Sequence, residues 1–129
     1  MREIIFRGKR VKNNEWVYGS FLKQAGERIS KDEVAPIECW IYGMRGETAL
    51  VDPETVGQYT GLTDKNGTKI FEGDIVKVEN ALVRGIFAVE YCGISACFIV
   101  SCGERRYFLG GCNSEVIGNI HDNPDRTAC

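Results

Sequence analysis

Four cysteines in the second half of the chain have the side chain of a metal ligand but not the usual ligand spacing. They are separated by four, four and nine residues: Cys92, Cys97, Cys102 and Cys112. Structural zinc sites usually place paired ligands about two to four residues apart. We therefore interpret these cysteines as small, buried, apolar side chains. A zinc site formed across adjacent strands and a disulfide or redox pair are the alternatives, and no cofactor is expected.

Basic side chains gather near the start of the chain, next to an aromatic one. The candidate nucleic-acid-binding residues are Arg7, Lys9, Arg10, Lys12 and Trp16. Cations hold phosphates, and an aromatic ring can stack on a base. The chain as a whole has a net charge of −2, whereas a dedicated nucleic-acid binder is usually basic. We therefore expect a solvated basic strand and turn, with nucleic-acid binding as the alternative.

Acidic side chains occur at the turns of the central segment: Asp52, Glu54, Glu72 and Asp74. Paired carboxylates can do acid–base work, but turns also recruit them for hydrogen bonds to backbone amides, which is the role we expect. The single histidine, His121, has no oxyanion-binding feature nearby that would favour a cysteine–histidine nucleophile. No glycine pattern fits a phosphate-binding loop. The sequence therefore predicts no catalytic residues and no enzymatic activity.

Short apolar segments between turn residues indicate that strands position these side chains. We expect strands near residues 3–7, 15–21, 37–42, 49–51, 56–62, 70–71, 75–78, 83–92, 96–102, 106–109 and 114–120. Asn66-Gly67 is a strong turn signal, because both residues adopt positive φ readily. Asp52-Pro53 can begin a single helical turn, and residues 23–33 are polar enough for an exposed loop. The predicted fold class is mainly β, with few or short helices.

The predicted strands fall into two groups. Residues 1–56 form a small β-rich N-terminal subdomain, and residues 57–121 carry enough strands for one small barrel. Residues 122–129 are expected to be a flexible tail. A subdomain of about 55 residues buries too little surface to be stable alone. We therefore expect it to pack against the barrel or against another subunit.

Six segments of the chain resemble the YopX family, whose members are proteins of bacteriophages and prophages. They are FRGK (6–9), EWVYG (15–19), VDPETVGQYTGL (51–62), DKNG (64–67), IFEGDIV (70–76) and EVIGNI (115–120). The resemblance implies a β-rich N-terminal portion followed by a C-terminal SH3-like small barrel, and assembly as homo-oligomers. It supplies no catalytic activity and no active-site residues.

The expected function is that of a non-enzymatic, self-assembling interaction module of a phage or prophage. No apolar run approaches the roughly 18–20 residues that cross a bilayer, and the first residues lack the apolar core of a signal peptide. We therefore expect no membrane partner and, with the resemblance, a location in the cytoplasm of a bacterial host. The expected partners are further copies of the chain and a host or phage protein. Nucleic-acid binding is the alternative function.

Overall fold

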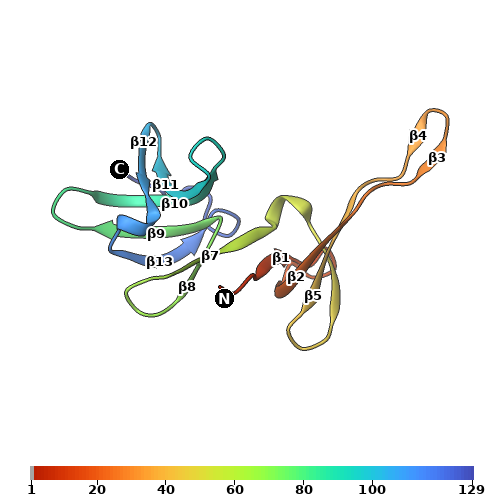
Figure 1. The fold of residues 1–129 in the computed structure, drawn as a ribbon, viewed down its shortest axis with the longest axis horizontal. Coiled ribbons are helices and arrows are strands. Elements are labelled where there is room, and N and C mark those ends of the chain that lie inside the picture. Colours follow the sequence, from red (N-terminus) through yellow and green to blue (C-terminus); the bar gives the residue numbers. More distant parts are fainter. Residues whose placement is uncertain (1) are drawn as a thin grey trace. The chain divides into compact units, whose positions relative to one another are not determined.

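Strands dominate the regular structure of this protein in the computed structural model, which describes residues 2–129. Besides strands, those residues form only two short 3₁₀ helices, which confirms the mainly β class. The chain divides into an N-terminal unit, Glu3–Gln58, and a C-terminal unit that comprises Tyr59–Cys129 and Arg2 (Figure 1). The division lies two residues after the predicted boundary at residue 56, and strand β7 (Gly57–Thr63) runs across it.

The N-terminal unit is an antiparallel sheet whose two edges are hydrogen-bonded to each other. Its strand order is β6 (Thr48–Val51), β5 (Glu38–Gly43), β2 (Trp16–Gln24) and β1 (Phe6–Lys9), followed by the first residues of β7. Just after β1, Arg10 forms an isolated bridge with Val51 of β6. The Val11 amide also donates to the Leu50 carbonyl at 3.0 Å. The sheet therefore curls around a small core of Val17, Cys39, Ile41, Ala49 and Val51.

A glycine allows two strands of this sheet to approach closely. Along β2, Val17 and Gly19 are buried, whereas Tyr18 and Ser20 are exposed, as expected for a half-buried strand. A β-carbon on Gly19 would collide with the backbone carbonyl of Tyr42 on β5. A larger residue at position 19 would therefore force β2 and β5 apart.

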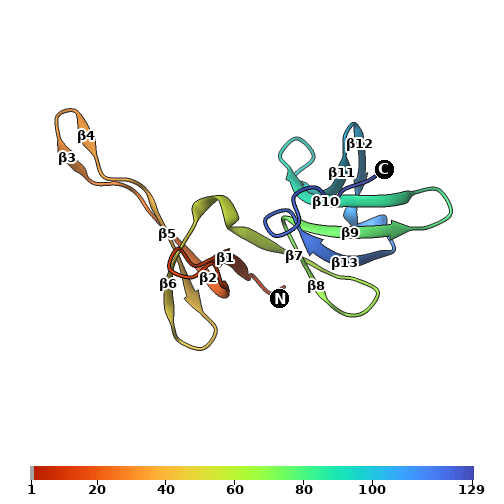
Figure 2. The same cartoon turned by 180° about the vertical axis from the view of Figure 1, so that it is seen from behind.

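The end of β2, the start of β5 and the chain between them form a hairpin, which we call the arm (residues 22–38). It contains β3 (Arg28–Ser30) and β4 (Glu33–Val34), and the Ala35 amide donates to the Glu27 carbonyl at 2.8 Å. The hairpin extends away from the rest of its unit (Figure 1; Figure 2 from behind). The predicted loop at 23–33 is therefore corrected, because the segment is exposed but paired. Both of its strands are exposed throughout, so the sequence lacks the alternation that marks a half-buried strand.

The C-terminal unit is built on a five-stranded antiparallel sheet. Its order is β12 (Arg105–Phe108), β11 (Cys97–Cys102), β10 (Arg84–Cys92), β9 (Asp74–Glu79) and β13 (Ser114–Asn119). The later part of β7 pairs with β8 (Lys69–Phe71). The core consists of Ile70, Val76, Val78, Phe87, Val89, Val100 and Leu109.

The strand pairing of the C-terminal unit does not confirm the predicted barrel. Strands β9 to β12 form a meander, and the 3₁₀ helix η2 (Leu109–Gly111) carries the chain from β12 to the other edge, where β13 pairs with β9. Within residues 2–129, β12 and β13 remain the two outer strands of this sheet. Strand β12 has only four residues and leads directly into η2.

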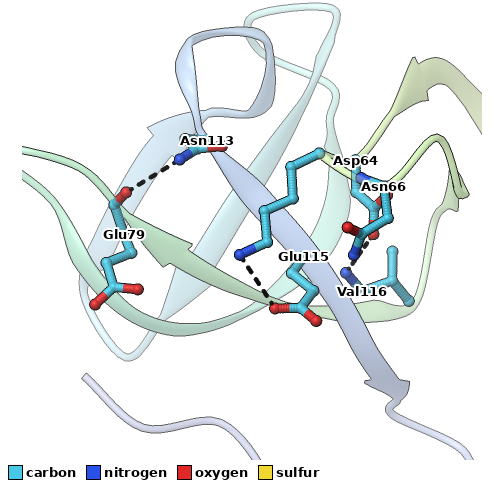
Figure 3. Close-up of polar contacts among 7 residues, drawn as sticks. Asp64, Asn66, Glu79, Asn113, Glu115 and Val116 are labelled. Atoms are coloured by element: carbon cyan, nitrogen blue, oxygen red, sulfur yellow. Dashed lines mark hydrogen bonds and ion pairs between the residues drawn. The ribbon is translucent and has the colours of Figure 1, made fainter.

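A buried carboxylate holds the β7–β8 turn against the last strand of the unit (Figure 3). Asp64 Oδ1 accepts from the amides of Asn66 and Thr68, both at 2.9 Å. Asp64 Oδ2 accepts from the Val116 amide, also at 2.9 Å. The turn itself is where the sequence predicts it, with Gly67 at a φ of 82°. The link to β13 joins residues 52 positions apart in the chain, so local sequence does not indicate it.

The segment predicted as a flexible tail, residues 122–129, has defined partners in the structure. Ala128 forms an isolated antiparallel bridge with Ile86 of β10. Cys129 forms a disulfide with Cys102, the last residue of β11. The composition of the segment indicates neither contact, because both partners are distant in the sequence.

Candidate functional site

One side of the N-terminal sheet carries a row of aromatic and aliphatic side chains, and we call it the outer face. Its residues are Trp16, Tyr18 and Leu22 of β2 and Trp40 and Tyr42 of β5. They share one side because alternate residues of a strand point the same way, and because Leu22 pairs with Trp40 and Ser20 with Tyr42. Tyr18, Leu22 and Tyr42 are exposed. The sequence shows the alternation within 16–21, but only the pairing of β2 with β5 unites the two rows.

Three of the five predicted nucleic-acid-binding residues meet at one end of the outer face. The Arg7 guanidinium lies 4.5 Å from the ring centre of Trp16, and the Lys9 ammonium lies 5.4 Å from it. Arg7 is only 5% exposed. Its charge therefore stabilises the indole ring through a cation–π contact, and it is poorly placed to bind a phosphate from solution.

The other two predicted basic residues have different surroundings. Arg10 Nη2 lies 3.9 Å from Glu47 Oε1, which makes an ion pair. Lys12 is exposed in the β1–β2 turn, where Asn14 adopts a φ of 59°. The four basic residues therefore have different surroundings: Arg7 and Lys9 contact the Trp16 ring, Arg10 pairs with Glu47, and Lys12 lies in a turn.

The arm carries exposed apolar side chains on a segment of balanced charge. Ile29, Val34 and Ile37 are 64%, 58% and 52% exposed. The charged residues of the arm are three basic and four acidic ones: Lys23, Arg28, Lys31, Glu27, Asp32, Glu33 and Glu38. A two-stranded hairpin is marginally stable by itself in water, and grouped exposed apolar side chains mark interaction surfaces. The arm is therefore the part of the N-terminal unit best suited to contact another molecule.

The structure separates the four cysteines of the candidate metal site. Cys92 and Cys97 face each other at the β10–β11 turn, whereas Cys102 is bonded to Cys129 and Cys112 follows η2. In residues 2–129, no three potential metal-ligating side chains come together. The four-cysteine alternative is therefore corrected, since the strands hold these residues at different ends of the sheet. The disulfide alternative applies to Cys102, with a partner that the sequence did not suggest.

Two of the free thiols have shifted pKa values. Hydrogen bonds from the backbone and hydroxyl of Ser95 lower the pKa of Cys92, and the charge of Arg106 acts in the same direction. Burial raises the pKa of Cys112, whose Sγ donates to the Phe108 carbonyl at 3.3 Å. The pKa of the Cys92 thiol therefore lies below that of the Cys112 thiol.

Two of the acidic turn residues have the structural role that the sequence predicts. Asp52 caps the 3₁₀ helix η1 (Pro53–Thr55), and its Oδ1 accepts from the Glu54 amide at 3.1 Å. Asp74 Oδ2 accepts from the buried Phe71 amide at 2.7 Å. Both carboxylates stabilise turns.

Nearly the whole chain matches one known protein family. The family of YopX proteins matches residues 5–127. The chain belongs to the YopX family. A solved structure similar to that of this YopX-family chain is the crystal structure of protein EF1440 from Enterococcus faecalis. The two sequences are 23% identical, and the two structures have a TM-score of 0.53 over 97% of this chain and 98% of that chain. At that identity the similarity concerns the fold alone.

The YopX match confirms the family indicated by the six motifs. Among curated proteins, none matches this chain. No helix in residues 2–129 is long and apolar enough to cross a membrane. The surfaces described above therefore supply the argument for function.

Proposed function

We propose that this YopX-family protein is a non-enzymatic, self-assembling interaction module whose main contact is the arm. The observation that carries the proposal is the exposure of Ile29, Val34 and Ile37 on a hairpin that projects from its sheet. Burying apolar surface against a partner is favourable by roughly 25 cal/mol per Å². The nearly equal numbers of acidic and basic residues on the arm support a partner with mixed charge, such as a second copy.

The outer face is the surface that we propose receives the arm of the other copy. Aromatic side chains such as Tyr18, Trp40 and Tyr42 are enriched in protein interfaces. If each arm packs on the other copy's outer face, both contacts are equivalent and the assembly closes as a symmetric dimer. Further contacts with a host or phage protein would then extend from this dimer.

The family supports the proposed setting. The resemblance to proteins of phages and prophages supports the cytoplasm of a bacterial host as the proposed working compartment. For the C-terminal unit, the meander β9–β12 and the return strand β13 support the SH3-like arrangement that the family resemblance implies. In this proposal the C-terminal unit is a stable body that carries the N-terminal contact surface.

Light scattering after size exclusion tests the assembly. The wild-type chain should give a mass of at least twice 14.4 kDa at micromolar concentration. The double variant Ile29→Glu, Val34→Glu should shift toward the monomer, because it places charges in the proposed contact. Ile94→Glu is the matched control, since Ile94 is 98% exposed in the other unit. A monomeric wild-type chain would overturn the proposal.

Nucleic-acid binding is the second proposal, supported by Lys9 beside the Trp16 ring and by the exposed Lys12 in the turn of the same hairpin. It requires binding to single-stranded DNA or RNA that weakens with salt, since phosphate contacts release counterions. Lys9→Ala with Lys12→Ala should weaken that binding, whereas Lys31→Ala on the arm should not. Absence of binding at low salt removes this proposal.

A further inference from the structure

Strand β10 has different neighbours along its length. Residues Arg84 to Ala88 pair with β9, and Ala88 to Cys92 pair with β11. The pairing of β10 with β11 ends at Ala88. At Ile86, the edge of β10 that faces away from β9 can therefore pair with another segment. Ala128 occupies this position.

The contact with Ala128 has the geometry of strand addition. The Ile86 amide donates to the Ala128 carbonyl at 2.6 Å, and the Ala128 amide donates to the Ile86 carbonyl at 2.9 Å. Gly85 has a φ of 154°, and a β-carbon on it would lie 3.1 Å from the Ala128 carbonyl oxygen. The edge of β10 therefore fits a close-lying extended backbone.

A covalent bond holds this short segment in place. Cys129, the neighbour of Ala128, is bonded to Cys102 at the end of β11. A single antiparallel bridge supplies only two hydrogen bonds at a sheet edge. The chain that follows β13 already tethers the segment near the edge, and the disulfide adds a second tether that raises its effective concentration there, so opening the disulfide weakens the contact.

We propose that the edge of β10 beside Ile86 is a strand-addition site for residues 126–129 of this chain. The segment comes from the same copy while the Cys102–Cys129 disulfide is closed, and from a second copy once it has been reduced. The segment of a second copy fits because it has the same sequence as the one seen on the edge. This contact uses the C-terminal unit and is independent of the arm.

The redox step balances with ordinary thiol chemistry. A dithiol reductant breaks the S–S bond, delivers two electrons and two protons to Cys102 and Cys129, and becomes a disulfide itself. In the reverse direction, one thiolate attacks glutathione disulfide, and the second thiolate then displaces glutathione from the mixed disulfide. If the two cysteines belong to different copies, the new bond links those copies covalently.

Amide hydrogen exchange on the full-length chain tests the release. Reduction should speed exchange of the Ile86 and Ala128 amides by about tenfold or more, because local opening exposes them. The amide of Val76, in the core strand β9, should not change. The measurement is made at a concentration low enough for the reduced chain to be monomeric, so that no second copy protects the edge. Unchanged exchange at Ile86 under these conditions would overturn the proposal.

A mixture of two variants tests the exchange between copies. Cys102→Ser keeps Cys129, and Cys129→Ser keeps Cys102, so only pairing between the two chains can restore the bond. With glutathione disulfide, the mixture should give a covalent dimer of twice 14.4 kDa whose link maps to Cys102 and Cys129. Adding Ala128→Pro to the Cys102→Ser chain removes the amide hydrogen that residue 128 donates to the Ile86 carbonyl. This change should reduce the yield of the covalent dimer. A dimer yield no higher than that of each variant alone overturns the proposal.

The same experiment separates this inference from the arm contact. Placing Ile29→Glu and Val34→Glu in both chains should leave the covalent dimer in place, because the exchanged segment contacts β10. If the covalent dimer forms while the wild-type chain without reductant is a monomer, strand addition stands and the arm proposal fails. If assembly depends on the arm but no Cys102–Cys129 link forms, the reverse holds.

Discussion

The two units differ in the size of their cores and in how the sheet of each is closed or held. The N-terminal unit encloses a small core by bridging its sheet edges at Arg10 and Val51, and leaves large aliphatic side chains exposed on the arm. The C-terminal unit encloses a larger core around Phe87 and fixes its β7–β8 turn with buried Asp64. The comparison indicates that the C-terminal unit has the larger core and an additional buried polar link, whereas the N-terminal unit has a smaller core and an exposed hairpin.

The two units can be followed separately in solution. Both tryptophans, Trp16 and Trp40, belong to the N-terminal unit. Tryptophan fluorescence therefore reports on that unit, while far-ultraviolet circular dichroism reports on the strands of both.

The largest effect is expected for Phe87→Ala in the C-terminal core. Phe87 is fully buried, and removing such a ring costs about 3–5 kcal/mol of unfolding free energy. The circular dichroism transition should move to lower urea, while the tryptophan transition stays in place. If both transitions shift together, the units unfold as one and the comparison breaks down.

The next largest effect is expected for Asp64→Ala. The substitution leaves the amides of Asn66, Thr68 and Val116 without their acceptor, which should cost about 2–3 kcal/mol in urea unfolding. Glu115→Ala is the control. It removes only the exposed ion pair with Lys65, 3.4 Å long, and should cost less than about 1 kcal/mol. Equal losses for the two variants would contradict the role given to Asp64.

Asp64 should also make stability depend on pH. Burial raises its pKa, but the three amide donors and Lys65 outweigh this, so the folded pKa lies below the ordinary value of 3.8. The stabilisation is therefore complete above the ordinary value and is lost as the pH falls through the lower folded pKa. As the pH falls across this acidic range, the free energy of unfolding measured in urea should decrease more steeply for the wild type than for Asp64→Asn. Parallel pH profiles for the two proteins would contradict this contribution of Asp64 to the pH dependence of stability.

A smaller loss is expected for Gly19→Ala in the N-terminal sheet. The added methyl meets the Tyr42 carbonyl, and overpacking of this kind costs about 1–3 kcal/mol. The tryptophan transition should report it. Gly93→Ala is the control, because a β-carbon at Gly93 meets nothing within 4 Å. An unchanged tryptophan transition for Gly19→Ala would mean that β2 and β5 adapt more easily than the geometry indicates.

The smallest effect on folding is expected for Ile29→Glu on the arm. Surface substitutions usually change stability by less than about 0.5 kcal/mol, and Ile29 is 64% exposed. Unfolding of the monomer at low concentration should therefore match the wild type, although assembly weakens. A large loss of monomer stability would show that the arm supports its own unit instead of a partner.

Much of the local structure could be predicted because its causes are local. Alternating apolar residues mark β2 and β9, Asn66-Gly67 marks a turn, and Asp52-Pro53 marks the start of η1. The YopX motifs identify the family because they are long and continuous. The arm was missed because strands exposed on both faces carry no alternation.

The sequence alone determined the mainly β class, the main turns and the family. Only the tertiary structure decided which strands are neighbours, and with them the outer face, the burial of Arg7 over Trp16, the link from Asp64 to Val116 and the pairing of Cys102 with Cys129. The physical reason is the distance along the chain over which each kind of interaction acts. Turn chemistry and strand alternation act over a few residues, whereas strand pairing and burial depend on packing between segments that are distant in the chain.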